Sequence, residues 1–315
     1  MKKQILVIGS LNMDMCIRVA QIPKAGETIL ARDLNHIPGG KGANQAGAAG
    51  RSEGDVVMLG CVGNDEFGRI QSGKLQSMGV DTSGLKISED SPTGIAVIYV
   101  DDDGNNNIAV VPGANFDCDT SYLKEQDEQF QKCDYVLLQM EIPEESICYA
   151  VQRAKELGKT VILNPAPAPD SLPEAILKCV DYLTPNETEV SKLAGCGDCS
   201  LESVKEGAQR LLNQGIGNVI VTLGDKGSLL VNKEQQTIYP TRKVTAVDTT
   251  AAGDCFNGAF VTALSEGRSV EEAILFASTA ASIAVTRKGA LKSVPKREET
   301  DLILKEWKGD ISLWQ

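Results

Sequence analysis

Residues 248–260 read Asp-Thr-Thr-Ala-Ala-Gly-Asp-Cys-Phe-Asn-Gly-Ala-Phe, and this stretch decides how the rest of the chain is interpreted. The preceding residues 243–247 alternate β-branched with other side chains, which predicts a strand. From Phe256 the pattern becomes helical, and Gly267 ends the predicted helix. Small residues at the junction let a ligand approach the backbone, and the free amides at a helix start attract anions. The stretch therefore predicts an anion site.

Asp254 is unexpected in a simple anion site, because its charge repels phosphate. It fits a reaction in which it accepts the proton of a hydroxyl that attacks a phosphoryl group held by the amides. The structural alternative is an Asp that caps the helix, with Ala and Gly for close packing. The length of the whole run favours the catalytic interpretation, with Asp254 as the general base.

A second glycine-rich run, Gly-Gly-Lys-Gly-Ala-Asn-Gln-Ala, occupies residues 39–46 and leads into a predicted small-residue helix over 45–50. It is not a Walker loop, because Lys41 is followed by Gly and the spacing before it differs. In this order the two runs resemble the N- and C-terminal signatures of the ribokinase-type (PfkB) carbohydrate kinases, in the form with Ala at position 251. The resemblance covers essentially the whole chain. It implies transfer of a phosphoryl group from ATP to the 5-hydroxyl of D-ribose.

The resemblance also implies roles for individual residues around the reaction. The amides of Ala251, Ala252 and Gly253 are expected to form an anion hole beside the base Asp254, which also contacts the sugar. The other expected sugar-binding residues follow predicted strands or belong to the first glycine-rich run: Asn12, Asp14, Gly40, Lys41, Asn44 and Glu141.

Nucleotide and metal sites are implied in the same way. The expected nucleotide-binding residues are Asn186, Thr222, Gly224, Gly227, Gly253 and Ser278, of which Ser278 stands where relatives often have Asn or His near adenine. Glu189 is expected to hold Mg²⁺ through water, since magnesium prefers oxygen ligands; its Asn-Glu-x-Glu context is equally good helix capping. Potassium is expected at backbone carbonyls of two segments: Asp248, Thr250, Ala284, Arg287, Gly289 and Ser293.

Alternating strand and helix patterns predict a doubly wound, mainly parallel α/β sheet with helices on both faces. The last residues of each predicted strand turn polar or glycine-rich, which places a binding crevice at the carboxyl edge of the sheet. The predicted strands are 4–8, 56–59, 135–139, 160–163, 181–183 and 218–221.

A separate hairpin is predicted from strands 94–100 and 108–111, joined by an acidic turn. Its first strand is apolar on both faces and needs a cover. In relatives such a hairpin pairs with the region around Glu27 as a lid over the sugar, and the lids dimerise. We therefore expect one domain, 1–315, with a small β-sheet lid inserted from about 11–38 and 93–112, and a homodimer formed through that lid.

Composition limits the classes of function. The 315 residues are 42% hydrophobic and 23% charged, as in ordinary globular proteins, and the net charge of −12 argues against nucleic-acid or anionic-membrane partners. Nine scattered cysteines argue against a disulfide framework. The apolar run 5–8 is too short for a signal peptide or a membrane span, so we expect a cytoplasmic protein. The single histidine, His36, excludes a His-based triad.

Other functions remain open at this point. Kinases for 2-deoxyribose or fructose share the fold, whereas nucleoside kinases usually depart from the Gly-Gly-Lys-Gly-Ala-Asn motif. A sugar or nucleotide sensor without chemistry is a rival of another class, disfavoured by the intact Asp254 and the anion run. A nicotinamide dehydrogenase would need a Gly-x-Gly-x-x-Gly turn after its first strand, where residues 9–14 read Gly-Ser-Leu-Asn-Met-Asp.

Overall fold

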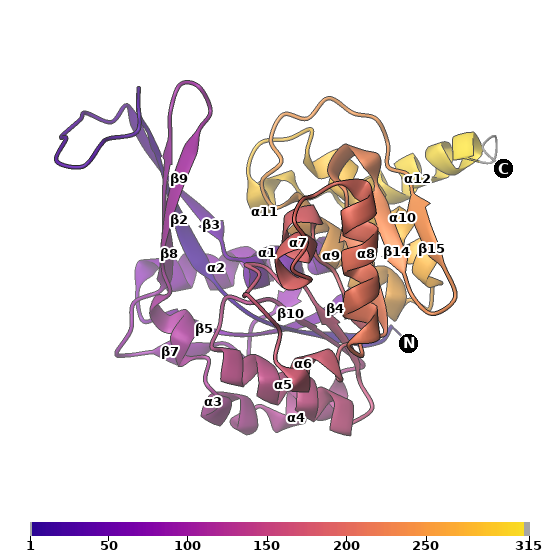
Figure 1. The fold of residues 1–315 in the computed structure, drawn as a ribbon. Helices are drawn as coiled ribbons and strands as arrows, with labels where there is room; N and C mark the ends of the chain where they lie inside the picture. The colour runs from indigo at the N-terminus through magenta and orange to yellow at the C-terminus, as the bar shows by residue number, and fades with distance from the viewer. Residues whose placement is uncertain (1, 312–315) are drawn as a thin grey trace.

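The computed structural model describes residues 2–311, and within this range a nine-stranded sheet forms the centre of the fold (Figure 1). The strand order is β15-β14-β13-β12-β11-β10-β1-β4-β6, and the pairs from β13 to β6 are parallel. The hairpin β14–β15 adds two antiparallel strands at one edge. The bounds are β1 (Gln4–Ile8), β4 (Asp55–Leu59), β6 (Val80–Asp81), β10 (Tyr135–Leu138), β11 (Thr160–Leu163), β12 (Tyr182–Leu183), β13 (Asn218–Thr222), β14 (Ser228–Val231) and β15 (Gln236–Tyr239).

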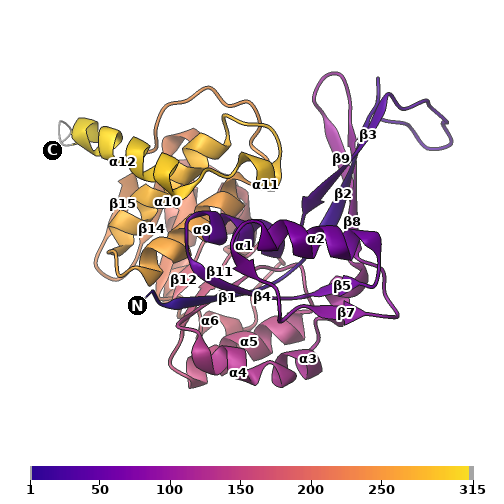
Figure 2. The ribbon, with the colours of Figure 1, turned by 180° about the vertical axis from the view of Figure 1, so that it is seen from behind.

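Helices cover both faces of this sheet, as the two opposite views show (Figures 1 and 2). Successive side chains of β1 point to opposite faces: Leu6 and Ile8 join one apolar core, Ile5 and Val7 another. The first core is shared with α3 (Thr120–Glu125), α4 (Asp127–Lys132), α5 (Glu144–Glu156), α6 (Glu174–Leu177), α7 (Glu187–Leu193) and α8 (Leu201–Asn213). The opposite face carries α1 (Lys41–Arg51), α2 (Glu66–Gln76), α9 (Ala252–Ser265), α10 (Val270–Ala284), α11 (Ala290–Ser293) and α12 (Arg297–Ile311). The predicted α/β class is confirmed.

A four-stranded sheet stands away from this body in both views (Figures 1 and 2). Its order is β3-β2-β8-β9, and the predicted hairpin β8–β9 is present. The expected pairing of this hairpin with the region around Glu27 is wrong: residues 27–31 form a loop in which Leu30 is 94% exposed, and β2 pairs with β8 instead. The bounds are β2 (Asn12–Arg18), β3 (Asp33–Gly39), β8 (Gly94–Val100) and β9 (Asn106–Val111).

Smaller elements complete the fold of the described residues. The strands β5 (Cys61–Gly63) and β7 (Lys86–Ser88) pair in parallel beside the main sheet. Short 3₁₀ helices span Gly113–Asp117 and Gly224–Lys226. Within residues 2–311, no helix is both long enough and apolar enough to cross a membrane.

The segment before the anion run differs from its prediction. Residues 243–247 form no strand, because the chain leaves the sheet edge after β15 and is anchored to a helix end. The amides of Val247 and Asp248 both donate to the carbonyl of Val285, which follows α10. The helix α9 then begins at Ala252 rather than near Phe256, after a left-handed Ala251 with a φ of +57°.

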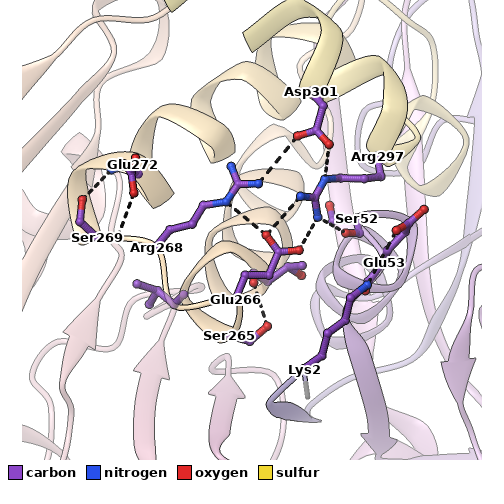
Figure 3. A network of polar contacts seen from close by, with 12 residues as sticks. Lys2, Ser52, Glu53, Ser265, Glu266, Arg268, Ser269, Glu272, Arg297 and Asp301 are labelled. Carbon is purple, nitrogen blue, oxygen red and sulfur yellow. Dashed lines mark hydrogen bonds and ion pairs between the residues drawn. The ribbon is translucent and has the colours of Figure 1, made fainter. Parts of the chain in front are cut away.

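An ion-pair network ties α9, α10 and α12 together (Figure 3). Arg297 of α12 bonds Glu266 at 2.5 Å, and the two side chains are only 15% and 17% exposed. Arg268 also bonds Glu266, at 3.2 Å. Both guanidinium groups lie over the ring of Phe276 in α10, at 4.7 and 5.1 Å from its centroid, within cation–π range. These contacts hold the end of α9, α10 and the start of α12 together.

We predict that Glu266→Gln lowers the free energy of unfolding by about 2–3 kcal/mol, because two largely desolvated guanidinium groups lose one of their two charged acceptors and keep only Asp301. Urea denaturation measures the change. The matched control is Glu128→Gln, since Glu128 pairs with Lys132 in solvent, with side chains 74% and 56% exposed; such pairs contribute about 0–1 kcal/mol. A loss at Glu266 no larger than at Glu128 contradicts the prediction.

Candidate active site

The candidate site lies where the parallel strands end, as the sequence predicts. Ser10 follows β1, Glu141 follows β10, and Asn164 follows β11. Thr184 and Asn186 follow β12. The first turns of α1 and α9 meet this edge, because side chains of α1 bond the start of α9. The topology therefore gathers polar groups from distant parts of the chain at one crevice.

Two adjoining pockets occupy this crevice. They share four lining residues: Thr222, Thr249, Ala252 and Gly253. The smaller, of about 180 Å³, is lined also by Lys41, Asn164, Ala166, Thr184, Asn186, Glu189, Ala251, Asp254 and Asn257. The larger, of about 320 Å³, is lined also by Gly224, Asp225, Gly227, Ser228, residues 241–244, Ala246, Phe256, Ser278, Ala281, Ser282 and Val285.

Asp254 is the third residue of α9 and is 7% exposed. Its Oδ2 accepts a hydrogen bond from Asn44 Nδ2 (3.0 Å), and its Oδ1 accepts one from Gln45 Nε2 (2.9 Å). Burial raises the pKa of Asp254, while the charge of Lys41 and the two amide donors oppose that rise. The helix is preceded by Ala251 and has no side-chain cap. The structural alternative, in which Asp254 caps the helix, is therefore wrong.

The free amides at the start of α9 differ from the expected set, because Asp254 takes the place of Ala252. The amide of Ala252 donates to the carbonyl of Thr249 at 3.2 Å. Those of Ala251, Gly253 and Asp254 bond no acceptor among the described residues. They remain available to an anion at the positive end of the helix dipole.

Lys41 begins α1 and brings one positive charge among several carboxylates. Burial lowers the pKa of Lys41, but nearby carboxylates outweigh this and the net pKa is raised. Those carboxylates belong to Asp254, Glu141, Glu189 and Asp14. In the described part of the chain its ammonium forms no ion pair with any of them, so it remains able to bind another anion.

The backbone around Gly40 is close to Asn12. Gly40 has a φ of +89°, and a Cβ there would lie 2.7 Å from the Asn12 nitrogen, so only glycine fits. Asn12 and Asp14 belong to β2 of the small sheet, not to a loop after β1. The Asn12 side chain accepts a bond from Asn115 Nδ2 (2.7 Å). Burial, Glu141 and Asp254 raise the pKa of Asp14 to about 7 against the opposing charge of Lys41.

Glu141 joins three elements at the crevice. Its Oε2 accepts hydrogen bonds from Ser10 Oγ (2.5 Å) and from the Lys41 amide (3.1 Å). These bonds fix the end of β10 against the end of β1 and the start of α1. Glu141 thereby positions the glycine-rich run, and its negative charge also raises the pKa of Asp14.

Asn186 and Glu189 form a capping box at the start of α7, which confirms the structural interpretation of this motif. The amide of Asn186 donates to Glu189 Oε2, and that of Glu189 to Asn186 Oδ1, both at 2.8 Å. Both residues also line the smaller pocket. Burial raises the pKa of Glu189. Capping leaves the Oε1 atom of Glu189 available, so helix capping is compatible with the expected binding of Mg²⁺ through water.

The predicted cation segments are only partly brought together by direct bonds. Asp248 accepts from the amides of Thr250 (2.9 Å) and Gly289 (2.8 Å), so one carboxylate joins both segments. The Ala284 carbonyl accepts from the Arg287 amide at 3.0 Å. The Arg287 guanidinium instead bonds Glu299, and Ser293 Oγ donates to Ala290 O (2.8 Å).

Ser278 lies in the larger pocket and is 4% exposed. Its hydroxyl has no hydrogen-bond partner in residues 2–311. A buried hydroxyl without a partner is costly, which makes it a ready contact for a polar ligand.

Four functional candidates have no predicted role: Gln45, Asn115, Asn164 and Asn257. Gln45 bonds Asp254 directly, and Asn115 bonds Asn12. Asn257 accepts from Thr184 Oγ1 (2.6 Å) and donates to the Gly253 carbonyl (2.9 Å). Gln45 stands inside the first glycine-rich run, which is the one sequence signal that points to it.

The chain is similar to known proteins over nearly its full length. The profile of the pfkB family of carbohydrate kinases matches residues 2–297. The chain is 40% identical to the ribokinase of Haemophilus influenzae over 300 residues, covering 95% of this chain and 98% of that protein. It is 36% identical over 295 residues to the deoxyribokinase of Salmonella typhi, covering 94% and 96% of the two chains.

A solved relative shares the whole fold. The structure of Arabidopsis thaliana ribokinase complexed with ribose and ATP superposes with a TM-score of 0.89, at 34% identity, covering 97% of this chain and 99% of that chain. The family profile and both curated relatives extend over nearly the full length. This chain therefore belongs to the pfkB family of carbohydrate kinases.

Proposed function

We propose that this protein transfers the γ-phosphoryl group of ATP to the 5-hydroxyl of D-ribose, giving ribose 5-phosphate and ADP. The observation that carries the proposal is the Asp254 carboxylate, buried and held by two amide side chains beside free amides of α9. Similarity to a ribokinase bound to ribose and ATP supports the choice of sugar. Similarity to a deoxyribokinase keeps 2-deoxyribose as the alternative acceptor.

Each side of the crevice has its own part in this reaction. Asp254 accepts the proton of the attacking hydroxyl, and the free amides of Ala251 and Gly253 stabilise charge on the transferring group. Lys41, expected from the sequence to contact the sugar, lines the smaller pocket and is placed to bind the phosphoryl oxygens there as well. The sugar lies between Asp254 and the small sheet, where Asn12 and Asp14 offer hydrogen-bonding groups to its hydroxyls.

ATP is assigned to the larger pocket, with Ser278 near its base and Thr222, Gly224 and Gly227 along its path. Mg²⁺ fits beside Glu189, since Oε1 is an oxygen donor and Mg²⁺ is often held by one carboxylate, waters and substrate phosphates. When bound, it neutralises phosphate charge. Potassium is assigned to the Asp248–Gly289 junction, where the Asp248 carboxylate joins the two expected segments by accepting from the amides of Thr250 and Gly289.

The small sheet is proposed to act as a lid over the sugar within a single domain, and as the interface of a homodimer. Its outer strands expose apolar side chains: Leu34 is 51%, Ile108 57% and Val110 53% exposed. An exposed apolar edge of this kind needs a cover. Sedimentation equilibrium measures the assembly. All nine cysteines are unpaired, which fits the proposed cytoplasmic location.

The test of the proposed function is ADP release from Mg-ATP with ribose, 2-deoxyribose, fructose, adenosine or no sugar, with and without potassium. We expect ribose-dependent turnover that potassium increases. Turnover with another sugar alone would overturn the substrate and keep the chemistry. No turnover from folded protein that binds ATP would favour a sensor.

We predict that Asp14→Asn weakens ribose binding but stabilises the protein above pH 7. The pKa of Asp14 is raised to about 7, so its folded state holds the proton more tightly than its unfolded state. The contribution of Asp14 to the free energy of unfolding therefore falls as the pH rises from about 4 to about 7, and then stays constant. In the variant this fall is smaller by on the order of 1–3 kcal/mol. Denaturation at pH 5 and 8, with ribose calorimetry, checks both effects; an unchanged pH dependence contradicts the prediction.

A further inference from the structure

A buried glutamine, Gln45, contacts the proposed base Asp254 but lines neither of the two pockets. Gln45 is fully buried and is the fifth residue of α1. Its Nε2 is 2.9 Å from Asp254 Oδ1 and 3.0 Å from Asn164 Oδ1. It lines neither the larger nor the smaller pocket. Any influence of Gln45 on the ligands must therefore pass through its neighbours, of which Asp254 is the charged one.

The orientation of the Gln45 amide is fixed by a main-chain carbonyl. Asn164 Nδ2 donates to the carbonyl of Thr184 at 2.8 Å, and a carbonyl can only accept. Asn164 must therefore turn its oxygen toward Gln45, which in turn must present its nitrogen. The Gln45 oxygen accepts from Gln139 Nε2 at 2.7 Å. Every atom of the Gln45 amide is thus committed, and its second N–H points at Asp254.

Asn44, the other donor to Asp254, is not fixed in this way. Its Oδ1 is buried and has no partner in the described residues, so only the bond to Asp254 itself decides the orientation of the Asn44 amide. Of the two side-chain amides that donate to the carboxylate, only that of Gln45 is also held by other residues, Asn164 and Gln139. The orientation of Asp254 is consequently set by Gln45.

We propose that Gln45 is a positioning residue for phosphoryl transfer, which holds the Asp254 carboxylate in one orientation and stabilises its ionised form. The remaining lone pairs of Asp254 then face the sugar hydroxyl. This rests on the proposed role of Asp254 as the base. Charged and titratable groups reach Asp254 only over longer distances: Lys41 on α1, Asp14 on β2, Glu141 after β10, Glu189 on α7 and Cys255 on α9.

The test is Gln45→Met, which keeps the length of the side chain and removes its donor. A hydrogen bond to a charged group accounts for about a 10- to 100-fold change in an equilibrium. We expect kcat to fall by about 10- to 100-fold, with the KM for sugar little changed. Because the base must be ionised, we also expect the acid limb of the kcat profile to move to higher pH by about 1–2 units.

The matched control is Gln71→Met. Gln71 is fully buried in α2 and donates to the carbonyls of Asn12 and Gly39. The Gln71→Met variant should be less stable than the wild type, while the acid limb of its kcat profile stays at the same pH. Gln139→Met, which frees the Gln45 oxygen, should shift the limb in the same direction as Gln45→Met by a smaller amount. It replaces Gln45→Met if that variant does not fold.

The Asp254 carboxyl is also titrated directly by ¹³C NMR, with Asp254→Asn to assign the signal. This measurement needs no turnover. Wild-type protein inactive on ribose would therefore refute the proposed function, while the titration still decides the part of Gln45. A higher Asp254 pKa in Gln45→Met supports positioning; equal titrations and coincident acid limbs overturn it.

Discussion

Asp254→Asn should lower kcat by about 10²–10⁴-fold while the protein stays folded and still binds ribose. The loss follows because an amide cannot accept the proton of the attacking hydroxyl. The fold survives because both neighbours can adapt. Gln45 keeps donating to the remaining oxygen, and Asn44, whose Oδ1 has no partner among the described residues, can turn that oxygen toward the new N–H.

Three measurements separate this outcome from simple damage. Single-turnover rates give the chemical step, calorimetry gives the ribose affinity, and thermal unfolding gives stability. We expect stability equal to or above that of the wild type, because burial raises the pKa of Asp254 and its charge is therefore costly in the folded state. Retention of more than a few per cent of the wild-type rate would refute Asp254 as the base.

The main sheet could be predicted because its strands carry their own signal. β1 and β11 are short apolar runs followed by polar residues, and that pattern holds whatever lies next to them. The errors occur where a neighbouring segment of the same chain decides whether a strand forms. Residues 243–247 alternate as a strand does, yet their neighbour is the end of α10, to which they donate instead. The Glu27 region has the same weakness, since its loop finds no strand to pair with.

The site was predictable only as far as its motifs extend. Asp254 stands in a run whose chemistry can be interpreted from the residues, whereas the roles of Lys41 and Asn44 follow from the resemblance of the first glycine-rich run to a known family. The chain Asn164–Gln45–Asp254 joins residues 119 and 209 positions apart, and no spacing rule links amides at such separations. Asn115, 104 positions from Leu11, is hidden for the same reason. Neutral amides carry no charge pattern, so only the fold identifies them.

Lys41→Met should lower kcat/KM for Mg-ATP by about 10²–10³-fold, which is about 3–4 kcal/mol of transition-state stabilisation. Lys41 is the cation that faces Asp14, Glu141, Glu189 and Asp254, and it forms no ion pair with them within residues 2–311. Its removal leaves the carboxylates unbalanced just where a charged phosphoryl group must enter. Lys41→Arg keeps the charge and should recover part of the activity.

The loss of activity in Lys41→Met should depend on pH, and the charges around Lys41 determine in which direction. Lys41 lowers the pKa of both Asp14 and Asp254, so without it both carboxyls hold their protons to higher pH. The base is then ionised over a narrower range, and the deficit of Lys41→Met should be larger at pH 6 than at pH 9. Lys192→Met is the control, because Lys192 is half-exposed and pairs with Asp170 in solvent; its profile should match the wild type. A Lys41→Met deficit equal at both pH values would mean that Lys41 acts on the phosphates alone, without tuning the base.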